Sequence, residues 1–580
     1  MNSAGSLSLL QCLEAGLLRD IDVHLVHSLV RIYDVPLPES AQLVLALACR
    51  ATGDGHVCLA LDDVPPSLMP SADSDPDLRN AFAAAVAESG PVLRNHPRLV
   101  GTGVGNEPFV LEGSRLYLRR FWNYENSVAA KLLALAVEST GRRAADFETQ
   151  LAEATPPLSE GQKHAIRCAI EKRFSILTGG PGTGKTFVAA HLLVMLAKNS
   201  PLIRIRMAAP TGKAAARMDE SVGGVLKTMG VSLDKEPACT LERLLGFQSG
   251  SPYFRHNRQN PLPTDIVLID ETSMIDLPKM AKLLDAIGSG TQLILLGDKN
   301  QLASVEPGNV MAELCQSTAL SPVMATLTES KRFLDRTPVA ELAKSIQTGD
   351  PAKAWNWATS SSPDIRLRSS AKFDATQCPS SFKSSVTEGY REFIQTKTPK
   401  DAFSALSRFR VLCALRNGPQ GSIRVNEAIE EILSLHRKGE FYDHRVILVT
   451  QNNYDINLFN GDIGIVLHED TDTPFAYFED GKGKFRKIPC RLLPEHETAF
   501  AMTIHKSQGS GFGRVLVLLP DFSCPVMTRE LLYTAITRTE SGVELWCEET
   551  SFKKAISQPT VRHMGLQKKL DSPPATPRTP

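Results

Sequence analysis

The stretch that decides the fold is FSILTGGPGTGKT, residues 174–186. It begins as an apolar strand, continues as a glycine-rich loop, and leads into an apolar helical stretch over 187–197. Such a loop lets backbone N–H groups turn inward around phosphate oxygens, and the helix N-terminus adds positive potential. The spacing matches the phosphate-binding pattern GxxxxGK[ST]. The predicted nucleotide contacts are Gly179, Gly180, Pro181, Gly182, Thr183, Gly184, Lys185 and Thr186.

Two residue types within this loop indicate ATP with Mg²⁺. Lys185 is expected to reach the β- and γ-phosphates, and the Thr186 hydroxyl is expected to bind the metal. Downstream, Asp270 and Glu271 follow the apolar run 266–269. A carboxylate at the end of a core strand holds Mg²⁺ in P-loop proteins, so Asp270 is predicted as a metal residue and Glu271 as the group that orients the attacking water. These two motifs predict nucleotide hydrolysis, which transport ATPases, some kinases and helicases share.

The surrounding sequence predicts an α/β fold. Short β-branched runs alternate with helical segments, as in a parallel sheet flanked by helices. They form two sets, over 174–178, 203–208, 266–269 and 292–296, and over 410–414, 514–519 and 542–546. Residues before about 125 are mainly helical in pattern, with two short strands at 108–111 and 115–118. A block of short strands at about 445–493 reads as an all-β insert.

These patterns predict four segments along the chain. They are an N-terminal domain at 1–125, a first α/β domain with the P-loop at 126–330, a second α/β domain at 331–560 that carries the insert, and a disordered tail at 561–580.

Composition narrows the class of protein. The 580 residues carry 64 basic and 64 acidic side chains, so wholesale coating of DNA is not expected, although a local basic groove remains possible. The 11 cysteines form no CxxC pair, which argues against a zinc or iron–sulfur site and suits reduced thiols. Because neither a signal peptide nor an apolar run of about 18 residues occurs, we expect a cytoplasmic protein without a membrane partner.

Later motifs indicate a motor. Gln301 lies in GDKNQL (297–302), directly after a predicted strand, and its neutral amide suits sensing of the γ-phosphate. Arg332 in ESKRF and Arg538 in YTAITR belong to the second α/β domain. Arginines supplied across a cleft can stabilise the charge that develops in phosphoryl transfer. If the cleft closes only around ATP, hydrolysis would open it and drive movement along a strand.

The order GGPGTGKT, APTGKAA, DETS, GDKNQL, ESKRF, HKSQGS and YTAITR resembles superfamily 1 helicases of the 5′-to-3′ branch. Further stretches resemble the RecD family, the alpha subunits of exonuclease V, from about residue 5 to 550. Among them are LYLRRFW (116–122) and PEHETAFAMTIHKSQ (494–508). The resemblance implies two RecA-like P-loop domains, an SH3-like insert and an ATP-dependent DNA helicase that unwinds DNA ends for recombinational double-strand break repair. It also implies RecB and RecC as partners, with the N-terminal domain docked on RecC and the nuclease in RecB.

The resemblance also assigns residues. It implies that Gln162 recognises adenine and that a group of small polar and basic residues contacts the DNA backbone. Such side chains grip phosphates without reading bases, so binding should be sequence-tolerant and salt-sensitive. The implied DNA contacts are Pro210, Thr211, Lys213, Thr240, His505 and Ser507. This chain departs from the family pattern at Glu242, Lys331 and Gly511.

Several alternatives stay open at this point. The chain could be a free-standing helicase of the same branch, or a structural subunit with a vestigial ATPase. Lys213 and Arg217 could be a solvated helix face, and His505 could be a core histidine. Translocation polarity rests on the resemblance alone.

Overall fold

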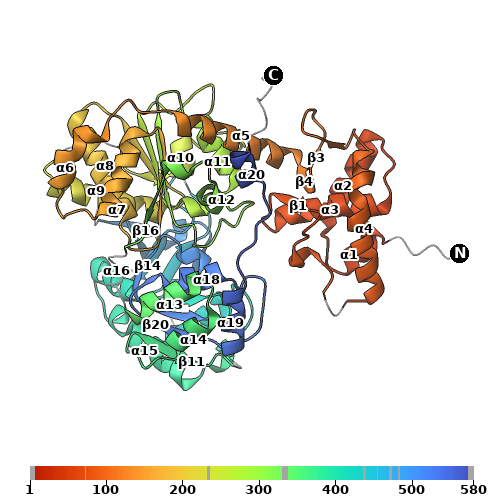
Figure 1. Ribbon diagram of the computed structural model, residues 1–580. Coiled ribbons are helices and arrows are strands. Elements are labelled where there is room, and N and C mark those ends of the chain that lie inside the picture. Colours follow the sequence, from red (N-terminus) through yellow and green to blue (C-terminus); the bar gives the residue numbers. More distant parts are fainter. Residues whose placement is uncertain are drawn as a thin grey trace.

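The computed structural model describes residues 7–71, 74–231, 236–329, 337–371, 373–435, 439–453, 455–468, 473–480 and 484–572. An N-terminal domain stands to one side of two α/β domains, which lie one above the other (Figure 1). The predicted α/β class is confirmed. Arg332, the predicted arginine finger, and Lys331, where the chain departs from the family pattern, lie outside the described residues.

The N-terminal domain packs four helices around a small sheet of order β1-β4-β3-β2. The two strands predicted at 108–111 and 115–118 are confirmed, since β3 and β4 pair as an antiparallel hairpin. Helix α3 is apolar over most of its surface and forms the centre of this core. The elements are α1 (Leu9–Glu14), α2 (Asp20–Tyr33), α3 (Glu39–Gly53), β1 (Cys58–Ala60), α4 (Pro76–Arg94), β2 (Val100–Gly101), β3 (Phe109–Glu112) and β4 (Arg115–Leu118).

The first α/β domain is a six-stranded parallel sheet of order β10-β5-β9-β8-β6-β7. Its central strands are fully buried apolar runs, as parallel strands covered on both faces must be. The strands are β5 (Phe174–Gly179), β6 (Ile205–Ala209), β7 (Cys239–Thr240), β8 (Ile266–Ile269), β9 (Gln292–Gly297) and β10 (Met324–Leu327). The helices are α5 (Arg119–Val137), α6 (Glu148–Ala152), α7 (Glu160–Glu171), α8 (Lys185–Asn199), α9 (Gly212–Thr228), α10 (Leu241–Leu245), α11 (Leu277–Ala286) and α12 (Val310–Gln316).

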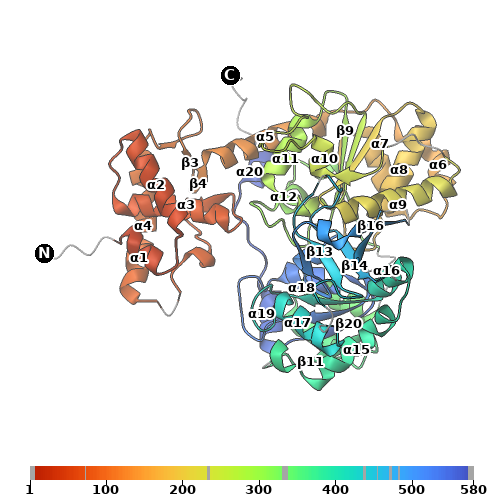
Figure 2. The ribbon, with the colours of Figure 1, turned by 180° about the vertical axis from the view of Figure 1, so that it is seen from behind.

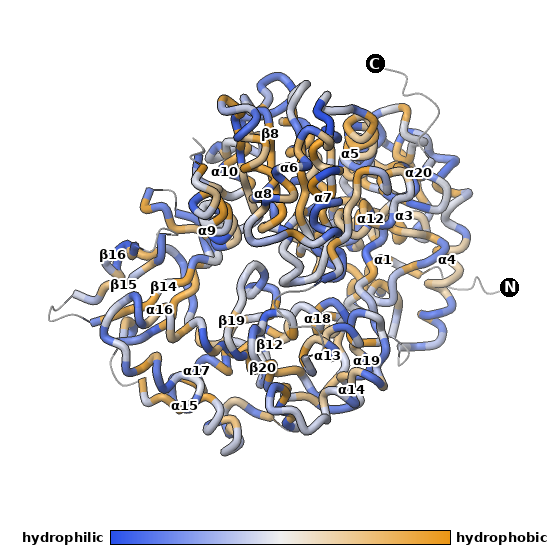
Figure 3. Tube along the Cα trace, turned by 60° about the vertical axis from the view of Figure 1, so that its left-hand side comes forward, coloured by the Kyte–Doolittle hydropathy of each residue, from blue (hydrophilic) through white to orange (hydrophobic). Residues whose placement is uncertain are grey.

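Hydropathy colouring shows the apolar residues of β8 and α8 gathered inside this domain (Figure 3). Helix α5 runs from the N-terminal domain onto α11, so the domain boundary predicted at residue 125 falls within a continuous helix. The carboxyl ends of β5, β8 and β9 meet at one edge of the sheet, which is where open α/β sheets bind their ligands.

The second α/β domain holds a five-stranded parallel sheet of order β11-β20-β19-β12-β18. Its strands are β11 (Ile365–Arg368), β12 (Phe409–Cys413), β18 (Ala501–Thr503), β19 (Phe512–Leu518) and β20 (Thr539–Trp546). Its helices are α13 (Pro338–Gln347), α14 (Pro351–Ala358), α15 (Ser380–Ile394), α16 (Pro399–Arg408), α17 (Ser422–Ile432), α18 (Arg529–Ile536) and α19 (Glu549–Ser557). Two parallel sheets in succession agree with the expected pair of RecA-like domains.

The predicted all-β insert is an antiparallel sheet of order β16-β15-β14-β13-β17. It extends to Thr498, five residues beyond the predicted end at 493, because β17 returns to pair with β13. The insert lies on the side of the second domain that faces α9 (Figure 2). Its strands are β13 (Val446–Val449), β14 (Ile463–Leu467), β15 (Phe475–Glu479), β16 (Phe485–Pro489) and β17 (His496–Thr498).

The predicted disordered tail is wrong over residues 561–572. After α19 the chain leaves the second RecA-like domain and returns to the other two domains, where α20 (Leu566–Asp571) packs on α5 and α12 (Figure 1). We call residues 558–572 the C-terminal strap. Leu566 and Leu570 are fully buried. The proline-rich sequence just beyond them had favoured a disordered tail.

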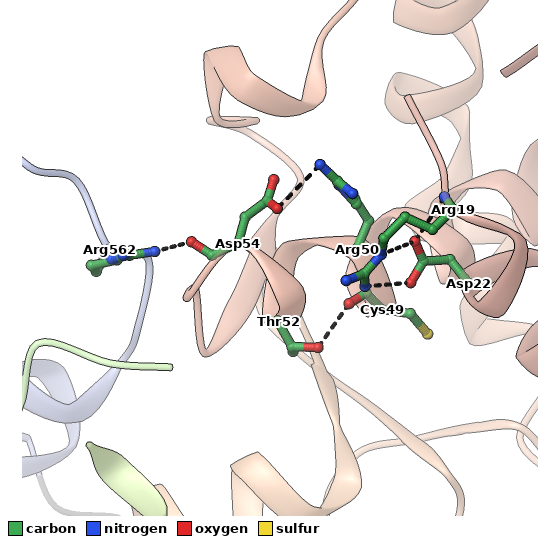
Figure 4. A network of polar contacts seen from close by, with 7 residues as sticks. All are labelled: Arg19, Asp22, Cys49, Arg50, Thr52, Asp54 and Arg562. Carbon is green, nitrogen blue, oxygen red and sulfur yellow. Dashed lines mark hydrogen bonds and ion pairs between the residues drawn. The ribbon is translucent and has the colours of Figure 1, made fainter. Parts of the chain in front are cut away.

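Polar contacts also hold the strap. The Val57 amide donates to the His563 carbonyl at 2.8 Å, and the Gly565 amide donates to Glu125 at 2.7 Å. Lys569 forms an ion pair with Glu112 at 2.7 Å. Arg562 donates to the Asp54 carbonyl, next to the Arg50–Asp54 and Arg19–Asp22 pairs of the N-terminal domain (Figure 4). The strap therefore joins all three domains.

Candidate functional site

The phosphate-binding loop joins β5 to α8 as the sequence predicts. Gly182 and Gly184 have φ of 77° and 82°, which side chains other than glycine rarely adopt. The Lys185 ammonium donates to the carbonyls of Gly179 at 2.7 Å and Gly180 at 3.1 Å. A phosphate would give this ammonium a charged acceptor in place of two neutral ones.

The predicted metal residues lie together. The Thr186 hydroxyl donates to Asp270 at 2.9 Å, across the gap between the loop and the end of β8. Burial and the neighbouring Glu271 raise the pKa of Asp270 to about 6, while Lys185 opposes the shift. Glu271 has a φ of 51°, a left-handed conformation that is costly outside glycine and is enriched at functional sites. The described residues contain no cluster of three or more His, Cys, Asp or Glu side chains arranged to hold a metal ion.

Gln162 lies at the start of α7, where it completes a capping box with Ser159. Its amide donates to the Thr183 carbonyl at 3.3 Å, and the residue is only 3% exposed. A Cβ on Gly184 would lie 2.9 Å from the same amide nitrogen. The predicted adenine contact is thus pinned against the phosphate-binding loop.

A chain of buried polar groups crosses from the first RecA-like domain to the second. Asp298, directly after β9, accepts from Gln301 at 3.2 Å and from the Tyr533 hydroxyl at 3.2 Å. Gln301 in turn accepts from Arg538 at 3.0 Å. Burial raises the pKa of Asp298, and the charge of Lys185 opposes that shift, so this network borders the phosphate-binding loop.

Arg538 is held by three acceptors and is 3% exposed. Besides Gln301 it donates to the carbonyl of Ser510 at 3.1 Å and to that of Thr534 at 3.3 Å. The structure therefore brings together Gln301 and Arg538, two residues that the sequence predicted separately. Fixed donors of this kind lose little order when they act on developing charge.

The predicted DNA contacts of the first RecA-like domain lie along one edge. Pro210, Thr211 and Lys213 are half-buried at the loop after β6 and the first turn of α9, and Thr240 is half-buried at the start of α10. Thr211 and Thr240 cap these helices with their hydroxyls. Because β6 and β7 are neighbouring parallel strands, with Ala209 opposite Thr240, the two helix starts lie at the same edge of the sheet.

The second RecA-like domain contributes the loop after β18. His505 is half-buried, and burial together with the charge of Arg562 lowers its pKa. Ser507 is fully buried, and its hydroxyl donates to the Ile504 carbonyl at 2.7 Å. The hydroxyl of Ser507 therefore closes the turn that carries this loop, and its DNA contact stays a prediction.

Comparison with known proteins sets this geometry in a family. Three family models match: "RecBCD enzyme subunit RecD, N-terminal domain" over residues 14–117, "AAA domain" over 162–307 and "UvrD-like helicase C-terminal domain" over 498–545. The chain is 36% identical to "RecBCD enzyme subunit RecD" of Mycolicibacterium smegmatis over 575 residues, covering 96% of this chain and 98% of that protein. The chain belongs to the RecD family.

Other RecD relatives are more distant. The RecBCD enzyme subunit RecD of Haemophilus influenzae is 31% identical, over 80% of this chain and 81% of that protein. The ATP-dependent RecD2 DNA helicase of Deinococcus radiodurans is 27% identical, over 87% of this chain and 65% of that protein. Among solved structures, the Pif1 helicase from Candida albicans aligns with 71% of this chain and 98% of its own, at 17% identity and a TM-score of 0.38.

Two residues of this RecD-family site were missed at the sequence level. Asp298 lies in GDKNQL and Tyr533 in YTAITR, so both stood inside motifs that had been singled out for a neighbour. A buried carboxylate requires a donor, and a tyrosine from the facing domain was an available one. Glu242, a departure from the family pattern, pairs with Lys279 at 3.1 Å. No helix in the described ranges has the length and apolar character to cross a membrane.

Proposed function

We propose that this chain is the ATP-dependent helicase subunit of a RecBCD-type enzyme and moves 5′ to 3′ along single-stranded DNA. The observation that carries the proposal is the Gln301–Arg538 hydrogen bond, which joins the two RecA-like domains beside the phosphate-binding loop. A group shared by both domains at that point lets the state of the nucleotide decide whether the domains are together or apart. Membership of the RecD family supports the helicase class and the 5′-to-3′ direction.

The phosphate-binding loop supports the use of a nucleotide, and we further propose that Mg²⁺ accompanies it. The Thr186 hydroxyl and the Asp270 carboxylate are oxygen ligands of the kind that Mg²⁺ prefers, and they already face each other at 2.9 Å. When bound, Mg²⁺ would supply positive charge that neutralises the charge developing on the phosphates. Lys185 binds the phosphates, Glu271 orients the attacking water, and Arg538 stabilises the charge from the second domain.

The DNA strand is proposed to lie along Pro210, Thr211, Lys213, Thr240 and the loop of His505. Helix N-termini, hydroxyls and one ammonium hold phosphates regardless of base, as a motor on arbitrary sequence requires. RecB and RecC are the proposed partners, because the relatives that match over nearly the whole chain carry the name RecBCD enzyme subunit.

The proposal is tested by ATP hydrolysis of the purified full chain, with and without single-stranded DNA. We expect DNA to stimulate hydrolysis and Lys185→Gln to abolish it, by at least about a hundredfold. Lys353→Gln is the matched control, because this lysine lies half-exposed on α14, away from the loop. The assay is repeated after assembly with RecB and RecC.

The outcomes separate the readings. Hydrolysis that survives Lys185→Gln, alone and in the assembled complex, would overturn the motor. A chain that unwinds DNA alone and does not assemble with RecB and RecC would be a free-standing helicase.

A further inference from the structure

Two cations from different domains lie over the ring of Phe512. The Lys213 ammonium of the first RecA-like domain lies 5.5 Å from the ring centroid. The Arg410 guanidinium of the second domain lies 5.2 Å from the same centroid. Phe512 is 2% exposed and Arg410 is also 2% exposed, so the ring is a buried seat rather than a surface contact. A cation over an aromatic face is held more strongly when it is desolvated.

Arg410 is an unusual residue for its place. It stands in β12, between β19 and the edge strand β18 of a parallel sheet, donates to the Ala499 carbonyl and leaves its buried Nε without a partner. A buried charge without a carboxylate partner is costly, so the contact with the Phe512 ring stabilises the Arg410 guanidinium. That contact fixes the ring, and the fixed ring is then available to Lys213.

The same strand end leads directly to Arg538. The Phe512 amide donates to the Arg538 carbonyl at 2.8 Å, and Arg538 donates to the Ser510 carbonyl at 3.1 Å. Arg217, one turn after Lys213, donates to the Gly509 carbonyl at 2.8 Å. The segment 509–512 is therefore bound on one side by α9 and on the other by the proposed arginine finger.

We propose that the Phe512 ring is the resting seat of the Lys213 ammonium, that a DNA phosphate competes with the ring for that ammonium, and that Phe512 thereby couples strand binding to the position of Arg538. The inference rests on the proposed function, since it takes the strand to pass beside Lys213. Phe512 is a positioning residue in this scheme, because it acts on the strand and on Arg538 without contacting ATP.

Competition predicts a result that packing alone does not. Removing the ring should release Lys213 and tighten DNA binding, whereas a ring that only packs, or that stacks on a base, would weaken binding when lost. The experiment measures the affinity of the full chain for a fluorescent oligothymidylate of about 15 nucleotides by polarisation. The variants are Phe512→Met, which keeps volume without a ring, and Phe512→Tyr, which keeps the ring.

We expect Phe512→Met to bind the oligonucleotide about two- to tenfold more tightly and Phe512→Tyr to bind like the parent chain. In a Lys213→Met background, Phe512→Met should change the affinity by less than about twofold, since there is no ammonium to release. The DNA concentration that half-stimulates ATP hydrolysis should shift in the same direction as the affinity.

Three results would overturn the proposal. These are equal or weaker binding by Phe512→Met, an effect that persists undiminished in the Lys213→Met background, and tighter binding without any shift in ATPase stimulation. Thermal unfolding of each variant checks that it is folded, and Phe512→Leu replaces Phe512→Met if the latter does not fold. If the parent chain, alone and with RecB and RecC, binds no oligonucleotide, it is the proposed function that fails.

Discussion

The two RecA-like domains meet beside the phosphate-binding loop, which we call the ATP side, and beside the proposed strand contacts, which we call the DNA side, and the two sides are built differently. On the ATP side, the side chains of Asp298 and Gln301 bond directly to those of Tyr533 and Arg538. On the DNA side, Arg217 and Lys213 of one domain reach a carbonyl and a ring of the other. Contacts to backbone and rings tolerate small displacements better than a buried hydrogen-bond network does. We therefore expect the contacts on the ATP side to be either made or broken as a set, and those on the DNA side to weaken gradually as the domains move.

The largest effect should come from the ATP side. Arg538→Ala removes a charge held by three acceptors beside the phosphate-binding loop, and we expect the turnover number to fall by about a thousandfold or more. Arg538→Lys is the sharper variant, because lysine keeps the charge but lacks the guanidinium fork. Single-turnover ATP hydrolysis measures both, and near-normal rates for Arg538→Lys would mean that charge alone matters.

Tyr533→Phe should have the next largest effect. It removes one donor from the buried carboxylate of Asp298, at a cost of about 1.5 kcal/mol or roughly tenfold in turnover number, with little change in the Michaelis constant for ATP. Tyr390→Phe, which loses a buried bond to the Phe500 carbonyl far from the loop, is the control for general loss of packing. A comparable loss of turnover in that control would contradict the network.

A pH dependence should mark the DNA side. Burial and the charges of Arg217 and Arg410 lower the pKa of Lys213 to about 7, while Glu479 acts in the opposite direction. A strand phosphate beside the ammonium would raise that pKa, so binding takes up a proton. Affinity should be constant below pH 7 and fall above it, by about two- to tenfold between pH 7 and 8.5.

Lys213→Arg is the matched control, since its guanidinium stays charged throughout this range. Burial also raises the pKa of Asp462, close to the start of α9, to about 6, so this carboxylate is mostly ionised above pH 7, where the fall in affinity is expected. An unchanged pH profile in Lys213→Arg would assign the dependence to another group. Polarisation titrations at constant ionic strength provide the measurement.

The smallest effect should come from Arg217→Met. It removes two bonds to carbonyls of the second domain, at Gly509 and Gly511, but keeps the apolar stem. We expect the concentration of DNA that half-stimulates hydrolysis to rise about two- to fivefold, with the maximal rate unchanged. A loss as large as that of Tyr533→Phe would erase the distinction between the two sides.

Much of the fold could be predicted because local patterns agree with it. The runs at 266–269 and 292–296 form buried strands. Both are continuous apolar stretches between polar turns, which is the pattern of a parallel strand covered by helices on both faces. The strap could not be predicted in this way. It is held by contacts with Glu125, Glu112 and Asp54, which lie more than 400 residues away in sequence.

The site shows the same division. Lys185, Thr186 and Asp270 were predicted because loop spacing and strand ends dictate their positions. Asp298 and Tyr533 were missed, because a hydrogen bond between two domains leaves no periodic trace in the sequence. The family resemblance implied a DNA contact at Ser507, and the structure adds that the local turn uses its hydroxyl.

The strap has a consequence for how the molecule is made. The N-terminal domain is synthesised first, yet its contact at Asp54 is completed by Arg562, 508 residues later. At about 5–20 residues per second, a ribosome needs roughly 25–100 seconds to supply that partner. The nascent N-terminal domain thus spends most of translation without its contacts to the C-terminal strap. The strap contacts among the three domains form only after α20 has been synthesised.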